Sequence, residues 1–213
     1  MEHDGKMATA VFNQRKRMQF LWLISPAIVF ALLSTRSAWE TGTVSGDLVR
    51  FAGLALILLC IAGRCWASLY VGGRKNQNLV MSGPYSIVRN PLYLFSTLGI
   101  GGIGLIFGSI ILAITLFILS YAVFSYVIAR EESTLESYFG AKYLTYCDRT
   151  PRFFPRIGQM MQMRTSHRNA EFSPPALKRT LIDASSLLIA LPVASIVDRL
   201  QEVQILPALF VLY

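Results

Sequence analysis

The chain has 213 residues and a net charge of +8, with 54% hydrophobic and only 15% charged residues. This composition is too apolar for an ordinary soluble domain and is typical of an integral membrane protein. Because Lys and Arg cluster beside the apolar runs and form no stripe interleaved with aromatic side chains, the positive charge favours cytoplasmic loops over a nucleic-acid partner.

Two apolar stretches predict the first membrane spans. A polar head ending in three consecutive basic residues precedes the apolar run 20–33. No small-residue cleavage site follows, so we expect an uncleaved first span with the N-terminus in the cytoplasm. Residues 34–47 are predicted to form a loop with Trp39 as an interfacial anchor, and residues 48–70 the second span. Arg64, near the end of that span, would either reach the headgroups or point inward at a ligand.

A helical hairpin is predicted next, with apolar arms at residues 92–107 and 110–129. The polar stretches at its two ends should therefore meet on one side of the membrane. Nothing breaks a helix between residues 110 and 139, and Gly140 suits the position just after a helix. At 1.5 Å per residue this helix would be about 45 Å long, which exceeds the ~30 Å hydrocarbon core, so we expect it to project into the cytoplasm.

Small residues in the first arm indicate close packing against another helix. Gly104 and Gly108 have the small-xxx-small spacing of such contacts. This pattern also leaves a homodimer open.

The C-terminal third is basic and then apolar. Residues 141–179 are irregular apart from a short helix that contains Tyr143 and Tyr146. Residues 181–197 are predicted to form a fifth span, whereas residues 205–213 are too short to span and would lie in the interface.

The distribution of Lys and Arg predicts the orientation. All but three of the twenty Lys and Arg residues (Arg36, Arg50 and Arg199) fall on one side of the five-span arrangement. The positive-inside rule makes that side cytoplasmic, so we expect the bacterial inner membrane, with the N-terminus and motif loops in the cytoplasm. The chain would form one domain over residues 1–213: spans 1–70, a motif region 71–156, and a basic linker with a C-terminal helix 157–213.

The sequence does not predict a metal site. Cys60, Cys65 and Cys147 have no metal-ligand spacing, and the chain contains only two His. We expect these cysteines to be small packing residues.

The polar stretch before the hairpin reads Gly-Pro-Tyr-Ser-Ile-Val-Arg-Asn-Pro over residues 83–91. Pro91 suits the first helical position and Asn90 suits the N-cap, so this motif can be explained as a helix start alone. A helix N-terminus beside Arg89 is also an anion site, suited to the carboxylate of a substrate or cofactor. The rings of Tyr85 and Tyr93 would form flat walls of this site.

The second polar stretch follows the hairpin. Glu131 and Glu132 are adjacent in a predicted helix and point about 100° apart, so they cannot serve one atom together. One of them would bind a ligand hydroxyl or balance a cationic ligand, while the other pairs with Arg89 or Arg130. The alternative is a solvated helix end with ordinary salt bridges.

Taken together, these motifs resemble the isoprenylcysteine carboxyl methyltransferase and phospholipid methyltransferase superfamily. The resemblance covers roughly residues 48–155 and includes the later positions Phe139-Gly140, Tyr143, Tyr146, Pro151 and Pro155. It implies an all-α, polytopic membrane bundle that uses S-adenosylmethionine without a Rossmann domain. It also implies a cytoplasmic cofactor pocket, roofed by the segment after the Glu pair and lined by Tyr85, Arg89, Asn90, Pro91, Tyr93, Glu131, Glu132 and Leu135.

One position departs from the carboxyl methyltransferase branch, which usually has His where this chain has Asn90. The Asn-Pro-x-Tyr form looks more like the phospholipid branch, and Asn cannot accept a proton near neutral pH. The expected acceptor is a lipid or a lipidated or small hydrophobic molecule, methylated on a carboxylate or an amine. Arg89 or Arg64 would place a carboxylate, whereas Glu131 or Glu132 would relay a proton from an amine.

Two alternatives remain open from the sequence. Related bundles in sterol reductases bind a nicotinamide cofactor in a similar position. A membrane subunit without catalytic activity would keep the bundle and bind neither cofactor.

Overall fold

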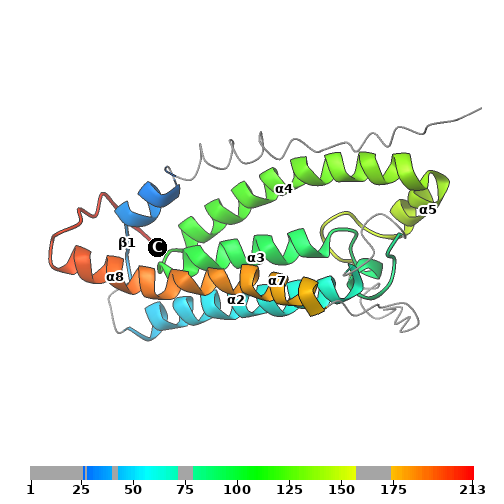
Figure 1. The fold of residues 1–213 in the computed structure, drawn as a ribbon. Helices are drawn as coiled ribbons and strands as arrows, with labels where there is room; N and C mark the ends of the chain where they lie inside the picture. Colours follow the sequence, from blue (N-terminus) through cyan, green and yellow to red (C-terminus); the bar gives the residue numbers. More distant parts are fainter. Residues whose placement is uncertain (1–25, 27, 40–42, 72–78, 157–173) are drawn as a thin grey trace, which may run out of the picture.

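The computed structural model describes residue 26 and residues 28–39, 43–71, 79–156 and 174–213, and within these ranges the fold is mainly helical (Figure 1). The elements are β1 (Thr35–Ser37), α2 (Val44–Val71), the short 3₁₀ helix η1 (Gly83–Ser86), α3 (Pro91–Ile106), α4 (Ile110–Phe139), α5 (Ala141–Arg149), α7 (Pro174–Ser185), the 3₁₀ helix η3 (Ser186–Ile189), α8 (Ala190–Glu202) and β2 (Phe210–Leu212). Residues 20–25 and 27 of the predicted first span, 20–33, lie outside the described residues, and the described part of this span is helical.

Helix α3 is the centre of the bundle. Figure 1 shows α3 between α4 on one side and α2 with α7 on the other, and none of its sixteen residues is exposed. Glycines allow this close packing: a Cβ atom on Gly53 of α2 would lie 2.7 Å from the carbonyl oxygen of Gly102. A Cβ atom on Gly104 would lie 2.3 Å from the backbone nitrogen of Ala113 in α4. Gly104 therefore packs within the hairpin, as its small size predicts.

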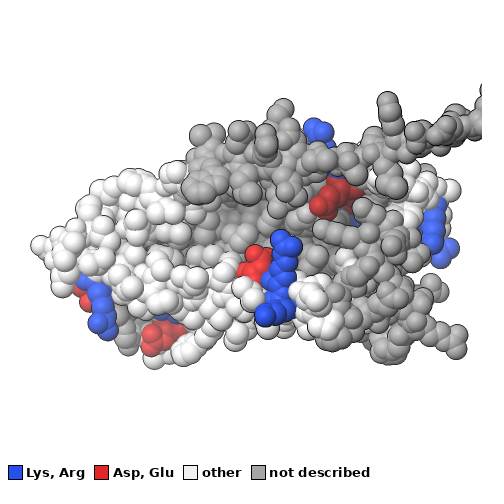
Figure 2. Space-filling view, viewed as in Figure 1, with Lys and Arg blue, Asp and Glu red and all other residues white. Residues whose placement is uncertain are grey.

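The outer helices present an apolar surface. Within the described ranges, three stretches are long and apolar enough to cross a membrane, namely Val44–Val71, Ile110–Phe139 and Pro174–Glu202, whereas α3 is shorter. Their large hydrophobic side chains are exposed, including Leu48 and Ile118. In Figure 2 the described part of the surface is mostly uncharged, with charged residues confined to a few places. These features indicate an integral membrane protein. The count of five spans and their orientation remain predictions.

The hairpin confirms the boundaries expected from its end signals. Helix α4 runs from Ile110 to Phe139, and Ser109 begins it by accepting a hydrogen bond from the backbone N–H of Leu112. Gly140 ends it with a φ of +52°, a left-handed conformation that glycine adopts without strain. Helix α4 has 30 residues and α3 has 16, so the C-terminal part of α4 extends well beyond the start of α3 at Pro91.

Two charged pairs attach α2 to the C-terminal helices. Arg64 of α2 contacts Asp183 of α7, and the guanidinium of Arg50 lies 2.7 Å from the carboxylate of Asp198 in α8. The predicted fifth span, 181–197, is thus part of a longer helical stretch that α7, η3 and α8 form together.

The prediction of a plain loop at residues 34–47 was wrong. Thr35–Ser37 forms β1, which pairs in parallel with β2, with Thr35 opposite Phe210. The ring of Trp39 packs edge-on against that of Tyr213, with centroids 5.4 Å apart. Phe210–Leu212 forms a strand because β1 supplies backbone hydrogen-bond partners, and the interfacial location of residues 205–213 stays a prediction.

Candidate functional site

A polar cluster lies where α3 begins and where α4 extends beyond it. Pro91 opens α3 as its first residue, as predicted, and the 3₁₀ helix η1 precedes it. The two carboxylates come from α4, more than one turn before its end at Phe139. The hairpin therefore brings the two predicted motifs together. We call Arg89, Asn90, Tyr93, Glu131, Glu132 and Arg152 the carboxylate cluster.

Glu132 is the most heavily paired carboxylate of this cluster. Its Oε2 lies 2.9 Å from Nε of Arg152, and its Oε1 lies 3.5 Å from Nε of Arg89. The side-chain amide of Asn90 also donates to Oε1 at 3.4 Å. Two guanidinium groups therefore face the one carboxylate of Glu132, and Glu131 balances the formal charge of the cluster as a whole.

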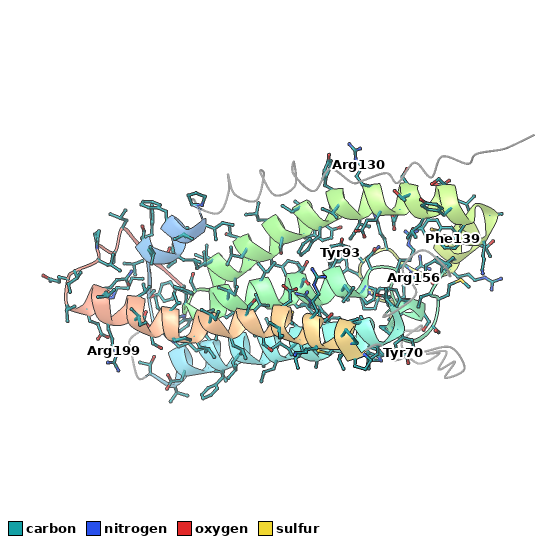
Figure 3. All side chains as sticks on the ribbon, in the orientation of Figure 1. Tyr70, Tyr93, Arg130, Phe139, Arg156 and Arg199 are labelled. Carbon is teal, nitrogen blue, oxygen red and sulfur yellow. The ribbon has the colours of Figure 1, made fainter. Side chains whose placement is uncertain are left out.

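Glu131 occupies a different position. Its exposed carboxylate accepts a 2.8 Å hydrogen bond from the hydroxyl of Tyr93. The ring of Tyr93 packs against Phe124, with centroids 5.1 Å apart, and Figure 3 shows Tyr93 between α3 and α4. Tyr93 thus orients a carboxylate that keeps further acceptor sites open to solvent.

Arg130 does not join the cluster. It points away from α3 in Figure 3, donates to the hydroxyl of Tyr126 at 3.2 Å, and lies over that ring. Of the two partners expected for a glutamate, Arg89 is therefore the one that the structure places beside Glu132.

The expectation that the side chain of Asn90 caps α3 was wrong. That side chain makes no capping hydrogen bond, although its backbone carbonyl accepts from Leu94. Its amide donates instead to the carbonyl of Arg152, at 3.0 Å, and to Glu132. A contact distant in sequence has replaced the local one, because the segment after α5 lies against the start of α3.

This segment after α5 is held to the first motif by three hydrogen bonds. The backbone N–H of Arg89 donates to the carbonyl of Pro151 at 2.9 Å, and Asn90 reaches Arg152. The hydroxyl of Tyr146 donates to the carbonyl of Tyr85 at 2.6 Å. The sequence did not single out Arg152: its residue type in a basic, proline-containing stretch gives no spacing signal.

Three tyrosines near the carboxylate cluster have hydroxyl groups that are hard to ionise. Burial raises the pKa of Tyr85, Tyr143 and Tyr146. The negative charge of Glu131 raises the pKa of Tyr85 further, and that of Glu132 does the same for Tyr143. At neutral pH these hydroxyls are protonated, and that of Tyr146 donates to the carbonyl of Tyr85.

The remaining predicted residues are spread more widely. Leu135 is half-buried on α4, one turn beyond Glu131. Arg64 pairs with Asp183 between α2 and α7, away from the contacts of the carboxylate cluster. Within the described ranges, no group of three or more His, Cys, Asp or Glu side chains could hold a metal ion.

The cluster offers matched groups for a ligand with both an anionic and a hydroxyl or cationic part. Nε of Arg89 is buried and makes no hydrogen bond within the described part of the chain, although it lies 3.5 Å from Oε1 of Glu132, so the guanidinium is only loosely paired. Glu131, 2.8 Å from the Tyr93 hydroxyl, is an exposed acceptor. S-adenosylmethionine carries a carboxylate, an ammonium group, ribose hydroxyls and a sulfonium, so its chemistry fits these groups.

The chain is similar to one protein family and to two metal-resistance proteins. A family model described as phospholipid methyltransferase matches residues 48–142. The chain is 36% identical over 157 residues to the cobalt-zinc-cadmium resistance protein CzcN of Cupriavidus metallidurans, covering 73% of this chain and 72% of that protein. It is 35% identical over 146 residues to the nickel-cobalt-cadmium resistance protein NccN of Alcaligenes xylosoxydans xylosoxydans, covering 68% of each. No solved structure matches the chain.

Proposed function

This chain belongs to the phospholipid methyltransferase family, and we propose that it transfers a methyl group from S-adenosylmethionine to a lipid or a small hydrophobic acceptor. The observation that carries this proposal is the juxtaposition of Arg89, Glu132 and Arg152 with the Tyr93–Glu131 pair at the start of the central helix. The family model matches residues 48–142, a range that includes Arg89, Glu131 and Glu132.

In this proposal the arginine side of the cluster binds the carboxylate of the cofactor. Arg89 supplies a guanidinium that is only loosely paired with Glu132, and Arg152 and Asn90 hold Glu132 so that it neutralises only part of the arginine charge. Glu131 binds the ribose hydroxyls or the ammonium group and contributes negative charge near the sulfonium. Tyr93 holds Glu131 for this task.

The cofactor supplies an electrophilic methyl group, whose transfer to the acceptor leaves a neutral thioether. The main task of the protein is to align donor and acceptor and to exclude water. A carboxylate acceptor needs no base, only a cation to place it, and Arg64 or Arg89 is proposed for this role. An amine acceptor must lose a proton, and Glu131 is the exposed carboxylate that could receive it. Asn90 cannot do so.

Cofactor binding can be tested on the detergent-purified full chain by calorimetry. Separate titrations would use S-adenosylhomocysteine and NADPH as probes. We expect a saturable heat with S-adenosylhomocysteine and none with NADPH. Saturable binding of NADPH alone would favour a reductase, and binding of neither would favour a subunit without catalytic activity.

The acceptor class can be tested with membranes that contain the chain and methyl-labelled S-adenosylmethionine. We expect the label to partition with lipid or with a small hydrophobic product. Membranes without the chain are the control. If they show the same label, the chain does not carry out the transfer.

The names of the relatives suggest a physiological setting. CzcN and NccN are named as resistance proteins for cobalt, cadmium and either zinc or nickel. We propose that methyl transfer by this chain likewise contributes to growth in the presence of such metals. A bacterial strain that lacks the gene for this chain should grow on medium with cobalt when it receives the wild-type gene. It should fail to grow when it receives the Glu131→Gln variant. Equal growth with the wild type and with Glu131→Gln would mean that resistance does not depend on methyl transfer.

A further inference from the structure

Three aromatic rings join the segment after α5 to the middle of α4. The ring of Phe153 packs edge-on against that of Tyr121, with centroids 4.8 Å apart, and the ring of Phe154 packs against the same tyrosine with centroids 5.7 Å apart. The two phenylalanine rings also contact each other, with centroids 5.2 Å apart. We call Tyr121, Phe153 and Phe154 the aromatic patch. Figure 1 shows the segment that carries the two phenylalanines running back from α5 between α4 and α3.

Tyr121 lies well inside the apolar part of α4. The apolar run 110–129 contains no charged residue, and Arg130 follows it. At 1.5 Å per residue this run is about 30 Å long, which matches the thickness of the hydrocarbon core. Tyr121 precedes Arg130 by nine residues, or about 13 Å along the helix. Because side chains in a helix lean toward its N-terminus, the ring of Tyr121 points away from the level of Arg130.

The aromatic patch continues the apolar outer face of α4. Ile114 and Ile118 are 54% and 60% exposed, and Tyr121, one turn further along the same face, is 37% exposed. Phe154 is 53% exposed, whereas Phe153 is buried and anchors the other two rings. Tyr121 and Phe154 therefore extend the surface that the isoleucines form. At this level of a membrane-spanning helix, an exposed apolar surface contacts acyl chains.

Arg152 lies where the segment after α5 changes from polar to apolar. Its guanidinium donates to the carbonyl of Ser125 at 3.4 Å, and its Nε lies 2.9 Å from the carboxylate of Glu132. These two positions of α4 lie on either side of Arg130, so the guanidinium is at the level where the apolar run ends. The two phenylalanines that follow in the chain reach from there to the ring of Tyr121, toward the interior of the membrane.

The backbone of this turn is suited to the edge of a membrane. The carbonyl of Pro151 accepts a hydrogen bond from the N–H of Arg89 at 2.9 Å, and that of Arg152 accepts one from the side-chain amide of Asn90 at 3.0 Å. Pro151 and Pro155 have no N–H group to leave unpaired. Because unpaired backbone groups are costly in hydrocarbon, these features allow the turn to lie against lipid.

We infer that residues 152–154 form a turn inserted into the membrane, and that Tyr121 and Phe154 bind an acyl chain of a lipid in the leaflet on the side of the carboxylate cluster. The polar end of that lipid lies at the level of Arg152 and the two glutamates, where it is placed as the methyl acceptor. The insertion of the turn is independent of the proposed function, whereas the role of the bound lipid as acceptor rests on it.

Fluorescence quenching by brominated lipid tests the insertion. The three Trp residues of the chain, Trp22, Trp39 and Trp66, are replaced with Phe to give a background without Trp emission. Phe154→Trp then places a single reporter in the turn. The full chain is reconstituted into vesicles of phosphatidylcholine, with and without bromine atoms near the middle of the acyl chains. Because bromine quenches Trp only at close contact, Phe154→Trp should lose emission in the brominated vesicles.

Two exposed positions on α4 provide the references for this measurement. Ile118→Trp lies in the apolar run and should be quenched about as strongly as Phe154→Trp. Tyr138 is 58% exposed and lies eight residues beyond Arg130, so Tyr138→Trp should be quenched several-fold less. Quenching of Phe154→Trp as weak as that of Tyr138→Trp would place the turn outside the membrane and overturn the inference.

Transfer of methyl label into the lipid fraction tests the role of the bound acyl chain. Phe154→Ser removes most of the apolar contact and should lower this transfer by about fivefold. Its affinity for S-adenosylhomocysteine should stay within about twofold of the wild type, because the cofactor is proposed to contact the charged groups. Tyr138→Ser is the matched control, an exposed aromatic residue replaced in the same way, and should leave both quantities unchanged.

The outcomes separate this inference from the proposed function. If the wild type transfers no label, the proposed function fails, and the quenching comparison alone decides whether the turn is inserted. If the wild type transfers label and Phe154→Ser does so equally well, the aromatic patch does not bind the acceptor. An equal loss of transfer in Tyr138→Ser would mean that the loss does not come from the patch.

Discussion

The two ends of the bundle are closed in different ways. At the end with β1 and β2, backbone hydrogen bonds dominate: Ala38 N–H donates to Leu212, Leu209 N–H to Ser34, and Ile111 N–H to Tyr213, each at 2.9 Å. At the other end, charged and polar side chains of the carboxylate cluster join α3, α4 and the segment after α5. Backbone pairing closes an end with little dependence on side-chain type. Side-chain pairing leaves donors and acceptors available to a ligand.

The largest effect is expected on activity, from the carboxylate cluster. Arg89→Ala and Glu131→Gln should each lower kcat/KM for methyl transfer by about a hundredfold or more, since each removes a charged group proposed to contact the cofactor. Arg130→Ala and Glu136→Gln are matched controls on the exposed part of α4 and should stay within about twofold. Wild-type turnover in Arg89→Ala or Glu131→Gln would remove the site assignment.

The two ends can also be compared through a pair of glycines with positive φ. Gly108 has a φ of +70°, and a Cβ atom added there would lie 2.5 Å from Oγ of Ser37. Gly140 has a φ of +52°, and apart from its own neighbours along the chain no described residue has an atom within 4 Å of such a Cβ. Gly140→Ala should therefore cost only the backbone strain of a positive φ, about 1–3 kcal/mol. Gly108→Ala should cost about 1–3 kcal/mol more, because Ser37 must move.

Denaturant unfolding of the purified variants measures this difference. The wild type provides the reference midpoint and slope. Equal destabilisation by the two substitutions would mean that Ser37 can move at little cost in free energy. The end with β1 and β2 would then be less tightly packed than its contacts indicate.

A smaller effect on activity is expected from Arg152. Its Nε lies 2.9 Å from Glu132, but its side chain is 40% exposed, so Arg152→Gln should lower kcat/KM by about tenfold. Arg152→Lys should restore part of this loss, because the positive charge remains. Arg156→Gln, at a nearby exposed position, is the control. If Arg152→Lys has the same kcat/KM as Arg152→Gln, the positive charge of Arg152 does not account for its effect on activity.

The tyrosines near the carboxylate cluster predict the response to alkaline pH. Their pKa values in the folded chain are raised above the ordinary value of about 10. The folded chain keeps these protons where the unfolded chain releases them, so stability is unchanged below about pH 10 and falls above it. Tyr146→Phe should cost about 1 kcal/mol at pH 8 through loss of its hydrogen bond to Tyr85, and should make the alkaline fall less steep. Unfolding free energies from pH 8 to 11 would show an unchanged slope if Tyr146 is not involved.

The smallest effect is expected from the Arg50–Asp198 pair at the opposite end. Its two side chains are 30% and 24% exposed, so the pair should contribute about 1 kcal/mol or less. A double-mutant cycle with Arg50→Gln and Asp198→Asn measures that coupling. Methyl transfer should be unchanged in each variant, and a loss of activity comparable to that of Arg89→Ala would mean that the two ends are coupled.

The sequence predicted the hairpin well because its signals are local. Pro91 at the first position of α3, and Gly140 directly after α4, are chosen by the conformation of one or two residues. The apolar run between residues 110 and 129 and the helix-forming residues up to Phe139 fix the length of α4. From these, the meeting of Arg89 with the Glu pair follows from geometry alone.

The sequence could not predict contacts between distant segments. Asn90 has the residue type of an N-cap, but its amide binds Arg152, 62 positions later, because the segment after α5 lies against it. The pairing of Thr35 with Phe210 depends on two three-residue strands that carry no periodic signal.

The sequence by itself determined the apolar helices, the central hairpin and the family motifs, because hydrophobic runs and helix-end residues act within a few positions. Only the tertiary structure decided which glutamate pairs with Arg89, that Arg152 joins it, and that the segment after α5 packs against Tyr121. These depend on side chains that become neighbours after the helices pack, and the free energy of each such contact depends on where the other segments lie.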